Sequence, residues 1–145
     1  MFKRLLQTDN SLTAFIVRIT VALVILPHGA QKLLGMFGGY GFKATMNYFT
    51  SSGTPAILAF LVILTESIGA LLILFGFTTR LWAAMLTVIM LVAMNMHKAN
   101  GFFMNWGGTQ AGEGFEYHLL VIGICIALII KGAGRWSVDG QLSNK

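Results

Sequence analysis

The sequence predicts an all-α integral membrane protein: a four-helix transmembrane bundle with short loops and both termini in the cytoplasm. Of its 145 residues, 56% are hydrophobic and only 10% are charged, and the mean hydropathy is +0.75. Ordinary soluble domains carry roughly 25% charged residues. The apolar residues also gather in four stretches, each near the length of roughly 20 residues that crosses a bilayer as a helix. This composition excludes a soluble enzyme domain.

The four apolar stretches predict the membrane spans of one domain, residues 1–145. The expected spans are 12–34, 55–77, 81–98 and 115–131. At about 1.5 Å per residue these stretches reach roughly 25 to 35 Å, enough to cross the hydrocarbon core. Thr54-Pro55 is a typical start signal for the second helix.

Three joints connect the spans. The first, residues 35–53, contains Gly38-Gly39-Tyr40-Gly41 and a mildly amphipathic piece, 42–49, which is expected to lie on the membrane surface or to re-enter it. The second joint, 78–80, predicts a tight helical hairpin. The third, 99–114, is rich in glycine and contains Trp106, which with its aromatic neighbours predicts an interfacial belt.

The cations that flank the spans predict the orientation, because lysine and arginine are enriched on the cytoplasmic side. One side carries Lys3, Arg4, Arg80, Lys131, Arg135 and Lys145, and the other carries Lys32, Lys43 and Lys98. We therefore expect a multi-pass protein of the bacterial inner membrane with both termini in the cytoplasm. The net charge of +5 reflects these flanks, and no nucleic-acid partner is expected. Cys125 is a single cysteine and predicts no internal disulfide.

Two charged residues fall inside the predicted spans, where a charge costs at least a few kcal/mol. Glu66 lies near the middle of the second span, and Arg18 lies about one turn to the cytoplasmic side of the middle of the first. An extended arginine side chain can cover this difference in depth, so we expect a buried Arg18–Glu66 ion pair. Two roles are open for the pair: it fixes the register of two helices, or it handles protons.

A second set of polar residues shares one depth in the outer third of the spans. Its members are His28, Gln31, Lys32, Asn95, His97, Lys98, Glu116 and His118. One interpretation is a polar pocket, floored by Glu66 and Arg18, that binds a quinone or another small polar headgroup. Its binding residues are then Arg18, His28, Lys32, Glu66, Asn95, Glu116 and His118, and its candidate proton carriers are Glu66, His28 and His118. The other interpretation is scattered interfacial residues and one ion pair. No metal site is expected, because the three histidines lie on separate helices without ligand spacing.

Four motifs follow one another in a recognisable order. They are Arg18 with Gly29-x-x-Lys32, Glu66-x-x-Gly69, Gly76-Phe77-Thr78-Thr79-Arg80, and Gly132-Ala133-Gly134-Arg135-Trp136-Ser137-Val138-Asp139. In this order they resemble the DoxX family of small four-helix membrane proteins, and the resemblance covers nearly the whole chain. Ala133 departs from the family's terminal motif, which more often has proline between the glycines.

The resemblance implies a redox-associated membrane subunit. The family takes its name from association with a membrane thiosulfate:quinone oxidoreductase, and relatives belong to membrane oxidoreductase complexes that handle thiol and oxidative stress. Quinone is therefore the expected cofactor, and a membrane or periplasmic redox protein is the expected partner, beside membrane lipid and a second copy of the chain. More distant animal relatives act as assembly chaperones or cargo receptors, so a non-catalytic assembly factor is the alternative. Whether the chain is itself an enzyme stays open at this point.

Overall fold

The computed structural model describes residues 5–143, and within them it contains helices and no strand. The elements are α2 (Leu12–Leu34), α3 (Gly41–Ser51), α4 (Ala56–Leu64), η1 (Thr65–Gly69), α5 (Ala70–Phe75), α6 (Thr79–His97), η2 (Lys98–Asn100), α7 (Glu116–Lys131) and α8 (Val138–Ser143). The predicted all-α class is confirmed for this part of the chain. Lys3, Arg4 and Lys145, which contribute to the predicted orientation, lie outside the described residues.

Three helical segments are long and apolar enough to cross a membrane. They are Leu12–Leu34, Ala56–Phe75 and Thr79–Asn100. The second contains η1, a π-helical turn between α4 and α5. The fourth apolar stretch also forms a helix, α7, but it has 16 residues. The described residues thus provide three candidate spans, where the sequence predicts four.

Local sequence explains where α2 begins and where α2 and α5 end. The Ser11 hydroxyl accepts a hydrogen bond of 3.2 Å from the Ala14 N–H, as an N-cap does. Gly35 ends α2 with a φ of 73°, and Gly76 ends α5 with a φ of 70°. Glycine adopts this left-handed conformation without the penalty that a Cβ brings. The chain can therefore turn sharply from α5 into α6.

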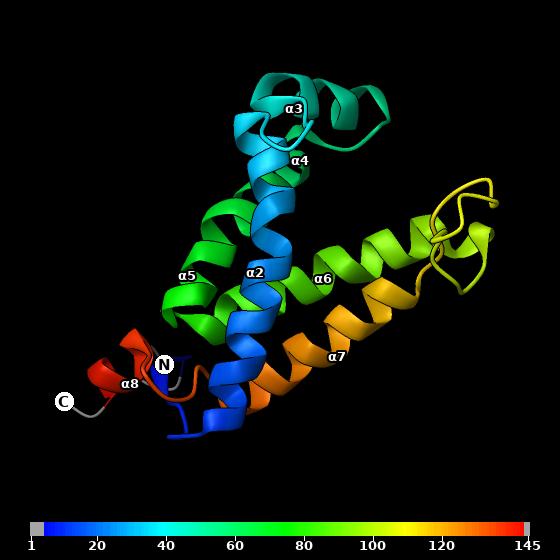
Figure 1. The fold of residues 1–145 in the computed structure, drawn as a ribbon. Helices are drawn as coiled ribbons and strands as arrows, with labels where there is room; N and C mark the ends of the chain where they lie inside the picture. The colour runs from blue at the N-terminus through cyan, green and yellow to red at the C-terminus, as the bar shows by residue number, and fades with distance from the viewer. Residues whose placement is uncertain (1–4, 144–145) are drawn as a thin grey trace.

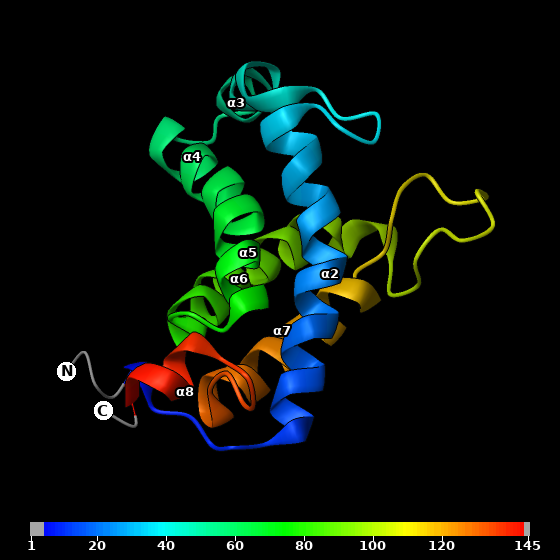
Figure 2. The same cartoon turned by 60° about the vertical axis from the view of Figure 1, so that its left-hand side comes forward.

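The helices form two groups that meet at one end of the molecule (Figures 1 and 2). α6 and α7 run side by side, and α2 lies against the segment from α4 to α5. We call the end that holds α8 and the start of α2 the proximal end. The opposite end, which holds α3 and the loop 101–115, is the distal end. α3 lies across the distal end of α2, so the amphipathic piece predicted at 42–49 is a short helix.

The core lies where the two groups of helices meet. Fully buried apolar side chains come from four helices: Val21, Ile25, Ile73, Leu86 and Leu128. Small residues let the helices approach closely, as is common between membrane helices. A Cβ built on Gly69, for example, would lie 2.6 Å from the ring of Trp82. Cys125 is fully buried in this core.

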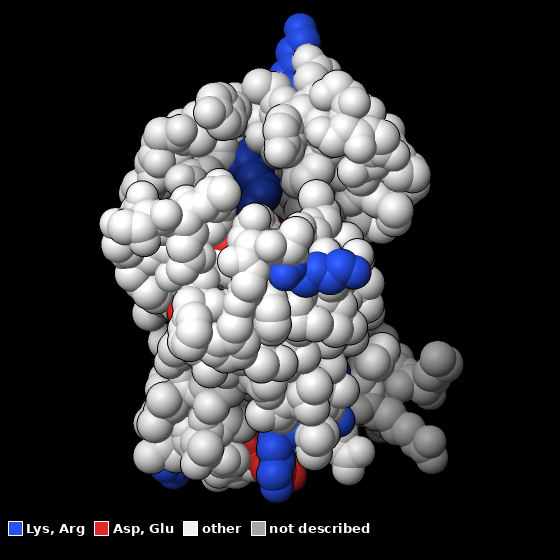
Figure 3. Space-filling view, turned by 90° about the vertical axis from the view of Figure 1, so that its right-hand side faces the viewer, with Lys and Arg blue, Asp and Glu red and all other residues white. Residues whose placement is uncertain are grey.

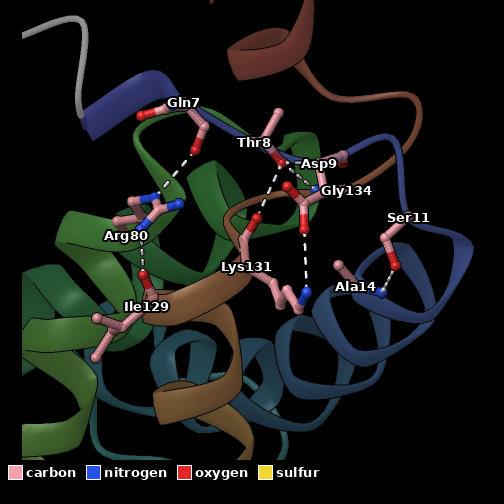
Figure 4. Close-up of polar contacts among 9 residues, drawn as sticks. All are labelled: Gln7, Thr8, Asp9, Ser11, Ala14, Arg80, Ile129, Lys131 and Gly134. Atoms are coloured by element: carbon pink, nitrogen blue, oxygen red, sulfur yellow. Dashed lines mark hydrogen bonds and ion pairs between the residues drawn. The ribbon is translucent and has the colours of Figure 1, made fainter.

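Basic side chains tie the N-terminal segment to the proximal end (Figure 4). Arg80 donates hydrogen bonds to the carbonyl oxygens of Gln7 at 3.0 Å and of Ile129 at 2.5 Å. Lys131 forms an exposed ion pair with Asp9 at 3.2 Å. The start of α2, the start of α6 and the end of α7 are therefore held at the same end of the molecule.

Arg18 lies completely inside the proximal end, with 1% of its surface exposed. Its Nη2 donates to the carbonyl oxygens of Arg135 and Trp136, each at 3.3 Å. Its guanidinium also lies 5.3 Å from the centre of the Phe15 ring. A Cβ on Gly76 would lie 1.8 Å from Nη1, so only glycine leaves room for this side chain. Arg18 thus joins α2 to the C-terminal segment.

Asp139 fastens the C-terminal segment to the turn between α5 and α6. Its carboxylate accepts the backbone N–H of Thr78 at 2.7 Å and of Thr79 at 3.0 Å. Its own N–H donates to the Gly76 carbonyl at 2.8 Å. Burial raises the pKa of the Asp139 carboxyl, while the two N–H donors and the nearby Arg18 oppose that rise. The last two family motifs therefore form one interlocked structure.

Asp139→Ala is expected to destabilise the protein by about 2 kcal/mol or more, because the half-buried N–H of Thr78 and the buried N–H of Thr79 lose a charged acceptor. Asp9→Ala is the matched control. Its carboxylate is exposed, so its loss should cost less than about 1 kcal/mol. Unfolding of both variants in mixed detergent micelles measures the difference. Equal losses of stability would show that Asp139 does not hold the turn.

Candidate functional site

Glu66 forms an ion pair with Lys32. The Lys32 ammonium donates directly to Glu66 Oε2. Only 6% of the Glu66 side chain is exposed, against 25% of that of Lys32. The pair joins the last turn of α2 to η1, which lies at the middle of the segment Ala56–Phe75. Both residues were predicted site residues, and the structure brings them together.

The predicted Arg18–Glu66 ion pair is wrong, because Glu66 lies level with Gly29. A Cβ built on Gly29 would lie only 2.1 Å from the Glu66 carbonyl oxygen. Arg18 precedes Gly29 by three turns, which is roughly 16 Å along the helix axis. No arginine side chain reaches that far. The partner of Glu66 is therefore Lys32, and Arg18 belongs to the proximal end.

The close contact between α2 and η1 depends on small residues. Besides the Glu66 carbonyl, the Cβ of any larger residue at 29 would meet Ser67 Cα at 2.6 Å. The Ser67 hydroxyl donates a hydrogen bond of 2.5 Å to the Ile63 carbonyl oxygen, so its partner lies within the same helical segment. π-helical turns occur preferentially at functional sites, and here the turn carries the buried carboxylate.

Two aromatic side chains lie beside the ion pair. The ring centres of His28, from α2, and Tyr117, from α7, are 6.3 Å apart. His28 precedes Lys32 by four residues on α2, so the two side chains lie on the same face of that helix. The hydroxyls of Tyr117 and Thr65 are buried and have no hydrogen-bond partner within the described residues. The site thus offers polar atoms that the protein itself does not use.

Sequence reasoning identified His28 and missed Tyr117. In the sequence, Tyr117 is one of several aromatic residues near the end of a span, where tyrosine commonly marks the membrane interface. Its only distinguishing signal is its place next to His118, at the start of the last apolar stretch. In the structure its hydroxyl is buried.

A pocket of about 440 Å³ adjoins Lys32. Its walls come from the last turn of α2, the following loop and α3: Gln31, Lys32, Gly38, Gly39, Tyr40, Ala44, Thr45, Tyr48 and Phe49. The volume falls in the range of small-molecule sites, which is roughly 300 to 1,000 Å³. Figure 3 shows a face on which a basic side chain is recessed in a hollow, with acidic atoms visible below it. The mostly apolar walls and one cation suit a planar ligand with polar oxygens.

His118 belongs to a neighbouring pair of rings. It is 8% exposed, and its ring stacks on that of His97 with centres 5.1 Å apart and planes 20° apart. His118 Nδ1 is buried and has no hydrogen-bond partner within the described residues. The ring also touches Tyr117, at 5.7 Å between centres. His118 is therefore linked to the ion pair through Tyr117.

The structure keeps Asn95 and Glu116 outside this site. Asn95 is exposed and accepts a hydrogen bond of 2.8 Å from Lys98. Glu116 accepts the Met104 N–H at 3.0 Å and the Trp106 indole N–H at 3.3 Å, so it orders the loop 101–115. Both side chains form their contacts at the distal end of α6 and α7. Across residues 5–143, His, Cys, Asp and Glu side chains do not gather in threes that could hold a metal ion.

The family model described as DoxX matches residues 13–105 of this chain. The chain belongs to the DoxX family. The match covers more than half of the sequence, and it includes both Lys32 and Glu66. The predicted resemblance is confirmed, and with it the assignment as a membrane protein.

Three relatives are similar to this DoxX protein at low identity. "Putative oxidoreductase CatD" of Bacillus subtilis (strain 168) is 29% identical over 78% of this chain and 75% of its own. "Inner membrane protein YqjF" of Escherichia coli (strain K12) is 30% identical over 90% of this chain and 92% of its own. "Uncharacterized membrane protein Rv3486" of Mycobacterium tuberculosis (strain ATCC 25618 / H37Rv) is 29% identical over 98% of this chain and 88% of its own. No solved structure matches the chain.

Proposed function

We propose that this DoxX protein is a redox-associated subunit of the bacterial inner membrane that binds a quinone headgroup beside the Lys32–Glu66 ion pair. The pair itself is the observation that carries the proposal. Charged groups within a membrane span are costly and are concentrated at functional sites. Here the pair adjoins a pocket of about 440 Å³. The name of the CatD relative supports a redox role, and that of YqjF supports the inner membrane.

The donors and acceptors at the site suit a quinone. The Lys32 ammonium has three N–H donors, of which one goes to Glu66, so others can donate to a quinone carbonyl oxygen. The Glu66 carboxylate can accept a hydrogen bond from a hydroxyl of the reduced ring. A bound quinone supplies the capacity to take up two electrons and two protons.

Aromatic and small side chains of the pocket would hold the ring in place. Tyr40, Tyr48 and Phe49 line the pocket together with Gly38 and Gly39, which add no side chains to it. The Gln31 amide donates to the Phe37 carbonyl at 3.1 Å and thereby fixes the loop that forms the rim. An isoprenoid tail can leave between helices whose outer faces are already apolar. Electrons would come from a partner redox protein in the membrane or on its outer surface.

We further propose that α7 is a fourth span and that both termini are cytoplasmic. The N-terminal segment contacts the end of α7 through Thr8, Ser11, Gly134 and Arg135 at the proximal end. If the start of α2 and the end of α7 lie on the same side of the membrane, the chain between them crosses the membrane an even number of times. α7 has 16 residues and is about 24 Å long, close to the hydrocarbon thickness. The basic residues at the proximal end favour the cytoplasmic side for the termini.

Quinone binding by the purified protein tests this function. The protein in lipid nanodiscs is titrated with a short-tailed ubiquinone analogue, and lipid extracts are examined for co-purified quinone. We expect saturable binding that Lys32→Met and Glu66→Gln each weaken roughly tenfold or more, since each removes a charge-assisted contact. Lys98→Met is the matched control, because Lys98 is exposed and bonded to Asn95.

The same titration separates the proposal from the alternative of an assembly factor. Absence of saturable binding, or equal binding by Lys32→Met and Lys98→Met, would contradict a quinone site at the ion pair. Crosslinking in cells would then decide whether one membrane protein is recovered and whether its abundance falls on deletion. That result is expected of an assembly factor and not of a quinone-binding subunit alone.

A further inference from the structure

A second pocket lies at the proximal end, at the opposite end of the molecule from α3. This proximal pocket has a volume of about 480 Å³, which is within the range of small-molecule sites. Its walls come from residues 8–10 of the N-terminal segment and from residues 134–137, Gly140 and Gln141 of the C-terminal segment. The Thr8 hydroxyl accepts the Gly134 N–H at 2.7 Å and joins the two walls (Figure 4). Most of the lining side chains are polar, so the pocket suits a polar ligand.

Arg135 supplies the positive charge of the proximal pocket. Its side chain is exposed, and among residues 5–143 no acidic side chain lies within ion-pair distance of it. The other charged residue of the lining is Asp9, which is paired with Lys131 at 3.2 Å. The charge of Asp9 is therefore offset, whereas that of Arg135 is available. This arrangement favours an anion over a cation in the pocket.

A second arginine lies behind one wall of the proximal pocket. Nη2 of the buried Arg18 donates to the carbonyl oxygens of Arg135 and Trp136, so it fixes the backbone that carries Arg135. Its Nε and Nη1 are buried and have no hydrogen-bond partner in the described part of the chain. Buried charges are screened less than exposed ones, so this guanidinium adds to the positive potential of the wall. Cations outnumber acids among the described residues of the proximal end, which are Arg18, Arg80, Lys131 and Arg135 against Asp9 and Asp139.

The rim of the proximal pocket meets the apolar surface of α2. Trp136 is 70% exposed, and its ring lies edge-on to that of Phe15 with centres 5.0 Å apart. Tryptophan is enriched where membrane proteins meet the lipid headgroups. Leu12, three residues before Phe15, begins a stripe of exposed apolar side chains that continues through Ile16 and Leu23 on one face of α2. An acyl chain that lies along this stripe has its headgroup beside the pocket.

We propose that the proximal pocket binds the headgroup of an anionic phospholipid, with the lipid phosphate on Arg135. A guanidinium matches the geometry of phosphate oxygens and donates two hydrogen bonds to them. The side-chain amides of Asn10 and Gln141 can bond to hydroxyl groups of the headgroup. Basic pockets at a membrane surface recognise anionic headgroups in the same way. The site does not include Lys32 or Glu66, so it is independent of quinone binding.

Native mass spectrometry of the delipidated protein in detergent tests the site. The protein is titrated separately with phosphatidylglycerol, with phosphatidylethanolamine, which has no net charge, and with inorganic phosphate. We expect phosphatidylglycerol to bind about fivefold or more tightly than phosphatidylethanolamine, and inorganic phosphate not to displace it. Arg135→Gln should weaken phosphatidylglycerol binding by about fivefold, the effect of one cation near an anionic lipid surface, and Arg135→Lys should keep most of the affinity.

Two further variants separate a headgroup site from a general effect of charge or folding. Lys43→Gln removes the same charge from an exposed residue of α3 at the distal end, and it should bind phosphatidylglycerol as the wild type does. Asp9→Asn removes the acid of the pocket and should strengthen binding, whereas damage to the fold would weaken it. Equal affinity for the two lipids, equal losses in Arg135→Gln and Lys43→Gln, weaker binding by Asp9→Asn, or displacement of the lipid by inorganic phosphate would overturn the proposal.

Discussion

Lys32→Met is expected to lower the free energy of unfolding by about 3 kcal/mol, because it leaves the Glu66 carboxylate buried without its partner. Only 6% of the Glu66 side chain is exposed, and it lies within the apolar helical segment Ala56–Phe75. Among the described residues, no cation other than Lys32 lies within ion-pair distance of Glu66. The loss is measured by unfolding in mixed micelles of a mild and a denaturing detergent.

The double variant Lys32→Met/Glu66→Gln completes this experiment. The double variant has no unpaired buried charge, so it should regain most of the stability that Lys32→Met loses. Lys98→Met serves as the control and should change stability by less than about 0.5 kcal/mol, because Lys98 is exposed. If the two single variants and the double variant have additive effects, Lys32 and Glu66 do not interact and the description of the site is wrong.

Gly29→Val is expected to have a comparable effect for a steric reason. A Cβ at position 29 would lie 2.1 Å from the Glu66 carbonyl oxygen and 2.6 Å from Ser67 Cα. Both are backbone atoms, so α2 must move away from η1. We expect a loss of about 1 to 3 kcal/mol, the usual cost of overpacking, and weaker quinone binding because Lys32 moves with its helix.

Gly123→Ala is the control for this steric effect. Gly123 lies inside α7, and no atom outside its own helix lies within 4 Å of a Cβ built there. Alanine is a better helix former than glycine by about 1 kcal/mol, so this variant should be neutral or more stable. Thermal unfolding followed by circular dichroism compares the two. Equal stability of Gly29→Val and the wild type would show that α2 and η1 are not in close contact.

Apolar length was sufficient to predict where the long helices lie. The stretch predicted at 12–34 is α2, Leu12–Leu34, and the stretch predicted at 115–131 is α7, Glu116–Lys131. A serine N-cap and a glycine C-cap define the ends of α2, and both are local signals. By contrast, α3 was predicted only as a surface or re-entrant piece, because a mildly amphipathic segment next to a membrane is compatible with both.

The partner of Glu66 could not be predicted from the sequence, because it depends on how far α2 slides along η1. The predicted Arg18–Glu66 pair assumed that the two spans are centred at the same depth. The Gly29 contact shifts Glu66 toward the distal end, and the C-terminal segment supplies carbonyl oxygens for Arg18 instead. The Arg18 contacts join residues more than 100 positions apart, and neither they nor the contact of Gly29 with Glu66 leave a periodic pattern in the sequence.

The family motifs acquire separate roles in the structure. Gly29-x-x-Lys32 and Glu66-x-x-Gly69 meet at the ion pair, where the first glycine allows the approach and the charges neutralise each other. Arg18, the Gly76–Arg80 turn and the segment that ends at Asp139 meet at the proximal end. We infer that the first group carries the ligand chemistry and that the second holds the bundle together.

Nuclear magnetic resonance of lysine ammonium groups tests the central claim most directly. With nitrogen-labelled lysine in nanodiscs, the Lys32 signal is assigned by its loss in Lys32→Met, and the quinone analogue is then added. Our account predicts that the Lys32 ammonium is close to the Glu66 carboxylate carbon and that its signal shifts on quinone binding while that of Lys98 does not. A quinone that binds without moving the Lys32 signal, or a Lys32 ammonium remote from Glu66, would contradict it.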